Sequence, residues 1–171
     1  MSISTAILPE FQHETANTRR TLERIPPPKL DWGPHEKSMT LRGLASHLAN
    51  IPNWGHLVLE DDHFDLEPPG QESTRVAAAE SLEEVFARFD SAVDRASGAI
   101  SSASDSTWGE GWSLLTGGQT LFTMPRIQVM RSMVLNHLIH HRGQLTVYLR
   151  MCEVPVPALY GPSADEASFG S

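Results

Sequence analysis

Four stretches of the chain repeat apolar residues at spacings of three and four, and proline-rich or glycine-rich segments separate them. This spacing places the apolar side chains on one face of an α-helix. One such stretch follows Ser81 and contains Leu82, Val85, Phe86, Phe89, Val93, Ala96 and Ile100. The sequence therefore predicts an all-α fold in which four amphipathic helices form a four-helix bundle.

Prolines delimit the first two helices. The first is expected over about residues 10–24, because no helix continues through the three prolines at 26–28. The second starts near residue 38, and Pro52 lies within its apolar pattern. We therefore expect a kink in the second helix at about residues 48–52.

Capping signals mark the starts of the other two helices. Ser81 and Glu84 have the spacing of a capping box, in which each side chain bonds a backbone amide at the helix start. Pro125 suits the first turn of the fourth helix, because its missing amide hydrogen would be unpaired there in any case. The fourth helix is expected to end at about residue 150.

The remaining segments connect these helices within one expected domain, residues 1–171. Residues 60–80 are acidic and contain prolines and a glycine, which indicates a solvated connection. Residues 107–124 contain two adjacent glycines between apolar pairs, which fits either a short β-hairpin between helices three and four or an irregular ordered loop. Residues 155–171 show no periodicity and are expected to form an extended arm.

Charge and cysteine content exclude several classes of protein. The 13 basic residues are outnumbered by 21 acidic ones, giving a formal charge of −8, so no nucleic-acid partner is expected. Cys152 is the single cysteine, so an internal disulfide cannot form and a cytoplasmic location is expected. The sequence lacks a signal peptide and an apolar run of about 18 residues, so no membrane association is expected.

The fourth helix carries histidines at positions where its pattern calls for apolar residues. Its inward stripe is expected to contain Ile127, Met130, Val134, His137, His141, Leu145 and Tyr148. His137 and His141 are one turn apart, about 40° around the helix axis, and therefore share a face. Two imidazoles in this arrangement can bind one divalent cation.

A third ligand must come from another helix, and His47 is the best candidate. It lies beside Leu44, Leu48 and Ile51 on the apolar side of the second helix. Three neutral imidazoles leave a coordination position open for water or substrate, as catalytic sites do. Zinc or nickel is the expected metal, although imidazole also accepts iron and copper.

Other polar residues have smaller expected roles. His140 and Gln144 fall within the same sector of the helix, and each is a candidate to orient a ligand imidazole or to relay a proton. For His140 the position is equally consistent with an ordinary surface residue. Cys152 lies about three turns beyond His141, roughly 16 Å along the axis, which is too far for a ligand. We expect structural or solvent-facing roles for His13, His35, His56 and His63.

Several segments together resemble the DinB/YfiT-like family, whose members are regarded as metalloenzymes. The similarity runs over nearly the whole chain, and the string HHRGQ after an earlier histidine on a helix is its most specific part. The segments are TRRTLERIP at 18–26, WGPHEKS at 32–38, LASHL at 44–48, GQTLF at 118–122, NHLIHHRGQ at 136–144 and YGPSADE at 160–166.

The resemblance implies an up-down-down-up four-helix bundle, commonly a homodimer, with a divalent metal on His47, His137 and His141. Some members of the family are thiol-dependent transferases that use bacillithiol, mycothiol or glutathione, and others are isomerases. A metal in such a site lowers the pKa of a bound thiol or water and thereby creates a nucleophile at neutral pH.

Three hypotheses follow. The first is a metal-dependent enzyme that activates a low-molecular-weight thiol or water for transfer to, or hydrolysis of, a small electrophilic substrate. The second is a non-catalytic metal-binding or stress-response protein, in which the ion joins the second helix to the fourth. The third is a bundle that mainly dimerises, with histidines hydrogen-bonded in its core. An open coordination position favours the first hypothesis, because a structural site is normally closed by four ligands.

Overall fold

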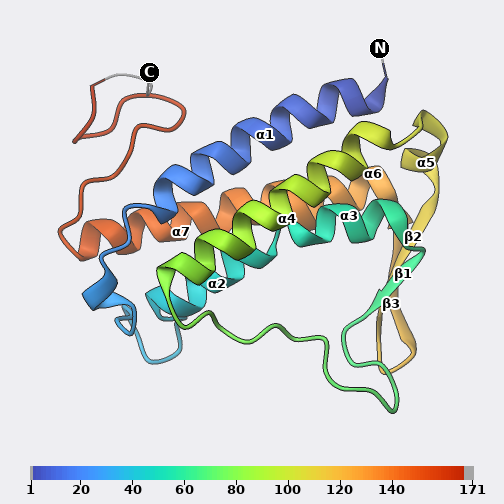
Figure 1. Ribbon diagram of the computed structural model, residues 1–171, viewed down its shortest axis with the longest axis horizontal. Coiled ribbons are helices and arrows are strands. Elements are labelled where there is room, and N and C mark those ends of the chain that lie inside the picture. The colour runs from blue at the N-terminus through green and yellow to red at the C-terminus, as the bar shows by residue number, and fades with distance from the viewer. Residues whose placement is uncertain (1, 168–171) are drawn as a thin grey trace.

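The computed structural model describes residues 2–167, and most of them are helical. Long helices lie side by side along the longest dimension of the molecule, and a small sheet lies at one end (Figure 1). The helices are α1 (Ile3–Leu22), α2 (Leu41–Asn50), α3 (Asn53–Glu60), α4 (Leu82–Ser102), α5 (Asp105–Gly109), α6 (Arg126–Val129) and α7 (His137–Met151), with a 3₁₀ turn η1 (Pro27–Lys29) and a π-helix η2 (Met130–Asn136).

The helix ends follow the local signals in the sequence. Ser81 caps α4 by accepting a hydrogen bond from the Glu84 amide at 3.2 Å, as the capping box predicts. The Glu84 carboxylate reaches back to the amide of Glu80 rather than to that of Ser81. The first helix begins earlier than expected, because Ser2 accepts from the Thr5 amide and caps α1 there.

The predicted kink is a full break. Helix α2 ends at Asn50 and α3 begins at Asn53, with Pro52 between them. Both α2 and α3 pack against α4, and Gly55 makes a close approach possible. A Cβ atom on Gly55 would lie only 2.8 Å from the Ala96 side chain of α4.

The expectation of an all-α fold needs correction, because the structure contains a three-stranded mixed sheet in the order β1-β2-β3. The predicted hairpin is present: β2 (Gly111–Thr116) and β3 (Gln119–Pro125) are antiparallel. Gly117 and Gly118 have positive φ, which two-residue hairpin turns require. The third strand, β1 (His63–Asp65), lies inside the segment expected to be a solvated connection and pairs with β2 in parallel.

Asp65 explains why a short strand forms in this acidic connection. Its carboxylate accepts hydrogen bonds from the amides of Gly117 and Gly118, at 3.0 and 2.7 Å, and so closes over the hairpin turn. Asp65 therefore has a structural role at the sheet. Among residues 2–167, the group that can hold a metal does not include the carboxylates around His63.

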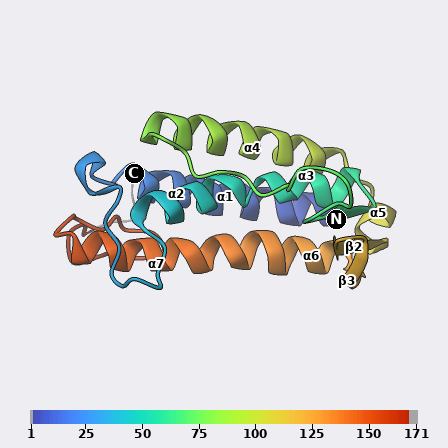
Figure 2. The ribbon, with the colours of Figure 1, turned by 90° about the horizontal axis from the view of Figure 1, so that it is seen from below.

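The helices enclose one main core. Helix α1 packs on α4 and α7, and α2 packs on the same two helices. Seen from below, α4 and α7 lie on opposite sides of α1, α2 and α3 (Figure 2). No helix within residues 2–167 is both long and apolar enough to cross a membrane.

The C-terminal arm lies against the helices as far as it is described. The Glu166 carboxylate pairs with Arg24 at 2.5 Å, and Asp165 pairs with Arg150. Its far end, residues 168–171, lies outside the described residues.

Candidate metal centre

The three histidines singled out by the sequence lie together. His47 comes from α2, and His137 and His141 come from the first two turns of α7. One ligand nitrogen from each of the three lies within 4.8 Å of the other two. Cys152, at the end of α7, is outside this histidine triad.

Hydrogen bonds fix the tautomers of two of these rings. His137 Nδ1 lies 3.3 Å from the Met133 carbonyl oxygen, and His141 Nδ1 lies 2.7 Å from Gln144 Oε1. Both oxygens can only accept, so each Nδ1 carries the hydrogen and each Nε2 keeps its lone pair. Metal-binding histidines in proteins are held by partners of this kind.

The contact between His47 and His137 fits a bound cation. Their Nε2 atoms are 3.1 Å apart, although His137 Nε2 has no hydrogen to donate. Two lone pairs at this distance repel each other unless a proton or a metal ion lies between them. Three imidazole nitrogens suit zinc, nickel, copper or iron, whereas calcium and magnesium prefer oxygen ligands.

Electrostatics keeps the triad neutral. Burial, followed by the neighbouring His141 and His137, lowers the pKa of His47 from 6.5 to about 4. Burial also lowers the pKa of His137 and of His141. Neutral imidazole is the form that binds metals, so the triad is ready to bind at neutral pH.

The π-helix η2 moves the histidines away from the position that periodicity predicts. A π-helix closes its hydrogen bonds over five residues, which shifts the face that follows. The buried face beyond it consists of Leu138, Arg142, Leu145 and Leu149, whereas the predicted stripe used His137, His141, Leu145 and Tyr148. The two histidines therefore lie half-buried at the edge of the core, where a ligand can reach them.

The other predicted residues have distinct positions. Gln144 contacts His141, as a residue that orients a ligand should. His140 is exposed, with its ring centroid 4.8 Å from that of His141. His13 contacts Asn17, and the Nδ1 atom of His35 accepts from the Lys37 amide.

A cavity of about 410 Å³ adjoins the triad, and His47 and His137 form part of its wall. This volume falls within the range of small-molecule sites, about 300–1,000 Å³. Its other lining includes Trp54, Phe64 and Met133. Trp32, Trp108 and Trp112, by contrast, do not line this cavity.

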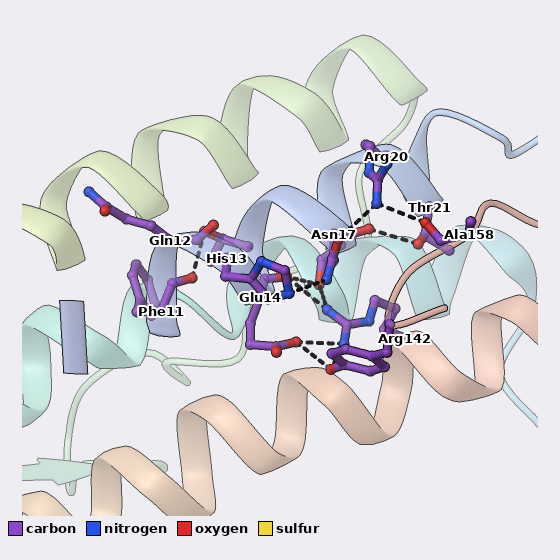
Figure 3. A network of polar contacts seen from close by, with 12 residues as sticks. Phe11, Gln12, His13, Glu14, Asn17, Arg20, Thr21, Arg142 and Ala158 are labelled. Carbon is purple, nitrogen blue, oxygen red and sulfur yellow. Dashed lines mark hydrogen bonds and ion pairs between the residues drawn. The ribbon is translucent and has the colours of Figure 1, made fainter. Parts of the chain in front are cut away.

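Sequence reasoning missed a buried ion pair beside the triad. Arg142 follows His141 directly, is 1% exposed and points toward α1 (Figure 3). It donates to Glu14 Oε2 at 2.6 Å and to the Glu14 carbonyl oxygen at 2.9 Å. Tyr160 of the C-terminal arm donates to the same Glu14 carboxylate at 2.6 Å. A carboxylate, that of Glu14, therefore lies within the buried face of α1.

A signal for this pair exists in the sequence of α1. Ile7, Phe11, Glu14, Thr18 and Leu22 are spaced at three and four, so Glu14 and Thr18 occupy the middle of an otherwise apolar face. A carboxylate in that position needs a buried cation. The spacing does not say which helix supplies it.

Solved structures share this fold. A DinB-like protein from Bacillus cereus ATCC 10987 matches 90% of this chain and 95% of its own, with a TM-score of 0.66 and 20% identity. A DinB-like protein of Bacillus subtilis, YjoA, matches 89% of this chain over 96% of its own length, with a TM-score of 0.64 and 16% identity. A mycothiol-dependent maleylpyruvate isomerase matches 90% of this chain and 62% of its own, with a TM-score of 0.53 and 11% identity. At these identities the likeness shows the fold.

Sequence comparison shows the family. The uncharacterised protein YrdA of Bacillus subtilis (strain 168) is 47% identical over 38 residues, which is 22% of this chain and 23% of YrdA. The match to YrdA thus spans about a quarter of that protein's length. The sequence model of the DinB family matches residues 1–168. This chain therefore belongs to the DinB family.

Proposed function

We propose that this chain is a divalent-metal-dependent enzyme that activates a small thiol or water for attack on a small electrophilic substrate. The observation that carries the proposal is the open histidine triad at the wall of a cavity. Three protein ligands within 4.8 Å of one another, with substrate-sized space beside them, match catalytic rather than structural sites. Zinc and nickel are the proposed metals.

A divalent ion bound by three imidazoles lowers the pKa of a thiol or water in its open position toward neutrality. The residues of the chain provide the conditions for this chemistry. His47, held neutral by burial, keeps a lone pair available at neutral pH. The Gln144 side chain and the Met133 carbonyl group hold the rings of His141 and His137 in one orientation.

His140 is proposed as a proton carrier. It is exposed, and its ring is adjacent to that of His141, so it can exchange protons with solvent. No carboxylate lines the cavity among the described residues, so no carboxylate base is available in its wall.

A thiol co-substrate is supported by a structural neighbour, since the maleylpyruvate isomerase of the same fold depends on mycothiol. We further propose that the chain is a single-domain four-helix bundle of the DinB type. In this description α2 and α3 together form one helix of the bundle, and α6 and α7 together form another. We propose a homodimer as the working state. Light scattering of the purified protein tests that state directly.

The test of the enzymatic role is metal-dependent turnover. Zinc-loaded and nickel-loaded protein is mixed with glutathione and 1-chloro-2,4-dinitrobenzene as the thiol-transfer probe, and with p-nitrophenyl acetate as the hydrolysis probe. Turnover is expected in the loaded protein and in His63→Ala, whose histidine is exposed in β1. It is expected to disappear in His137→Ala.

A purely structural ion gives a different result. Protein that binds the metal, shows no turnover of either probe and unfolds when the metal is removed supports the non-catalytic alternative. The cavity beside the triad speaks against that alternative, because an ion that only joins α2 to α7 needs no substrate-sized space.

A further inference from the structure

The wall of the cavity beside the triad carries a chemical pattern that the histidines do not explain. Apart from the two histidines, Arg75 is the only titratable side chain among residues 2–167 that lines it. The whole chain has a formal charge of −8, whereas the one permanent charge in the wall of this cavity is positive. The pattern indicates a ligand that carries a negative charge.

Aromatic rings form much of the apolar part of the wall, and a buried tryptophan packs against them. Trp54 and Phe64 both line the cavity, with ring centroids 5.3 Å apart. Trp112 is fully buried, and its ring centroid lies 6.2 Å from that of Trp54. Its indole N–H donates to the Leu57 carbonyl oxygen, and this hydrogen bond holds the Trp112 ring in place. Fixed aromatic rings of this kind bind flat or branched apolar groups without losing side-chain freedom.

The segment that carries Arg75 is anchored at both ends. Thr74 donates to the Leu66 carbonyl oxygen at 2.9 Å, and the Ala79 amide donates to Ser46 Oγ at 2.8 Å. This connection passes alongside α2 and α3 (Figure 2). Arg75 therefore lies on a segment that hydrogen bonds hold on either side of it.

Most neutral polar groups of the wall already have partners. The hydroxyl groups of Ser46 and Thr74 bond backbone groups, and Asn53 Oδ1 accepts from Arg95. In contrast, the side-chain amide of Asn50 and the indole N–H of Trp54 make no hydrogen bond within residues 2–167. Within residues 2–167, the Arg75 guanidinium group pairs only with Glu67, at 3.1 Å, and the two side chains are 79% and 54% exposed. Such exposed pairs are weak, so an anionic ligand can replace Glu67.

We propose that the substrate of this site has an aromatic or branched apolar body and a carboxylate, with the body against Trp54 and Phe64 and the carboxylate on Arg75. The inference rests on the proposed function, in which this cavity holds the substrate of the metal centre. A guanidinium group binds a carboxylate through two parallel hydrogen bonds. The side chains of Asn50 and Trp54, which line the same cavity, carry further N–H donors.

Three commercial probes test the inference by isothermal titration calorimetry. Indole-3-acetate has the apolar body and the charge, indole-3-acetamide has the same shape without the charge, and acetate has the charge alone. Each is titrated into metal-free and zinc-loaded protein. In both forms the indole acid is expected to bind about tenfold more tightly than its amide, and acetate is expected to bind too weakly to measure.

Two variants test separately which residue binds the carboxylate and which binds the apolar body of the ligand. Arg75→Gln is expected to remove the preference for the acid and to leave the affinity for the amide unchanged. Trp54→Ala is expected to weaken both indole probes about tenfold or more. Arg131→Gln is the matched control, because Arg131 has one exposed ion pair, with Glu10, and does not line the cavity. It should bind all probes as the wild type does.

The outcomes separate this inference from the proposed function. A preference for the acid that persists in Arg75→Gln but disappears in metal-free protein means that the metal binds the carboxylate, and it overturns the inference. Equal affinity for acid and amide in zinc-loaded wild type also overturns it, while the enzymatic proposal stands. Protein that never binds zinc contradicts the enzymatic proposal, yet an Arg75-dependent preference in that protein still supports the carboxylate site.

Discussion

The Nε2 atoms of His47 and His137 lie 3.1 Å apart, across the interface between α2 and α7. The hydrogen bond from His137 Nδ1 to the Met133 carbonyl group leaves His137 Nε2 as an acceptor. In the absence of a metal, a hydrogen on His47 Nε2 must fill this contact. Metal binding at His47 Nε2 therefore requires this hydrogen to move to Nδ1 of the same ring, a change of tautomer that releases no net proton because His47 is neutral.

Replacement of Gln144 tests the orientation of His141. Gln144→Leu removes the acceptor 2.7 Å from His141 Nδ1, so the ring loses its fixed tautomer. We expect the affinity for zinc to fall about 10-fold to 100-fold, as for other residues that support metal ligands. Competition with a chromophoric chelator measures it.

Two controls accompany this substitution. Gln144→Glu keeps an acceptor at the same position and should retain the affinity of the wild type. Gln128→Leu changes an exposed glutamine of α6 and should have no effect. Equal affinities of Gln144→Leu and the wild type would show that the hydrogen bond does not support the metal site.

The stability of the metal-free protein should depend on pH through His47. Burial and the neighbouring histidines lower its pKa from 6.5 to about 4, so the unfolded chain gains a proton at higher pH than the folded chain. His47 therefore leaves the free energy of unfolding unchanged above pH 6.5 and decreases it as the pH falls from 6.5 to about 4.

Urea denaturation in the presence of a chelator, from pH 7.5 to 4.5, measures this dependence. His47→Gln should lose less stability than the wild type as the pH falls, because its side chain does not titrate. His63→Gln, which changes an exposed histidine, should follow the wild type. Parallel curves for the wild type and His47→Gln contradict the prediction.

The buried pair of Glu14 and Arg142 should be sensitive to the loss of one partner. Arg142→Met leaves the Glu14 carboxylate buried without its cation, and we expect a loss of about 3–5 kcal/mol in the free energy of unfolding. The double variant Glu14→Leu/Arg142→Met should recover most of that loss, because no charge remains buried.

An exposed pair provides the comparison. Arg131 and Glu10 form an ion pair of 2.9 Å with side chains 51% and 34% exposed. Arg131→Met should therefore change the free energy of unfolding by less than about 1 kcal/mol. Similar losses in Arg142→Met and Arg131→Met would contradict the assigned role of the buried pair.

Tyr160 should hold the C-terminal arm to the helices. Its hydroxyl group donates to Glu14 and also contacts Arg142. Tyr160→Phe leaves those charged groups with one partner fewer, which should lower the free energy of unfolding by about 1–3 kcal/mol. Limited proteolysis within residues 153–167 should also become faster.

Tyr148→Phe is the control for this change, because Tyr148 packs edge-on against Trp32 and its hydroxyl group makes no hydrogen bond within residues 2–167. It should be cleaved at the rate of the wild type. An arm that is equally protected in Tyr160→Phe would show that the other contacts, from Arg24 and Arg150, suffice.

Periodicity and spacing were enough to predict the long helices and the histidine triad. The pair His137 and His141 shares a face because one helical turn separates the two residues, and His47 was identified by its apolar neighbours. These are properties of single helices, which sequence spacing describes well. The hairpin was predictable from the two glycines in its turn for the same reason.

Features that depend on contacts between distant segments could not be predicted. Strand β1 forms because Asp65 closes over the Gly117–Gly118 turn, more than fifty residues further along the chain. The half-buried position of His137 and His141 follows from the π-helix before them, which interrupts the helical period. The cavity depends on a nonperiodic connection that folds back over α2, so no sequence pattern could predict that Arg75 lines it.

The central claim is that His47, His137 and His141 hold one metal ion. Elemental analysis of untagged protein, purified without chelator and then incubated with zinc or nickel, tests it most directly. We predict about one divalent ion per chain in the wild type and in the control His140→Ala, and almost none in His47→Ala, His137→Ala or His141→Ala. A metal-free wild type, or a metal retained by all three alanine variants, would contradict the claim.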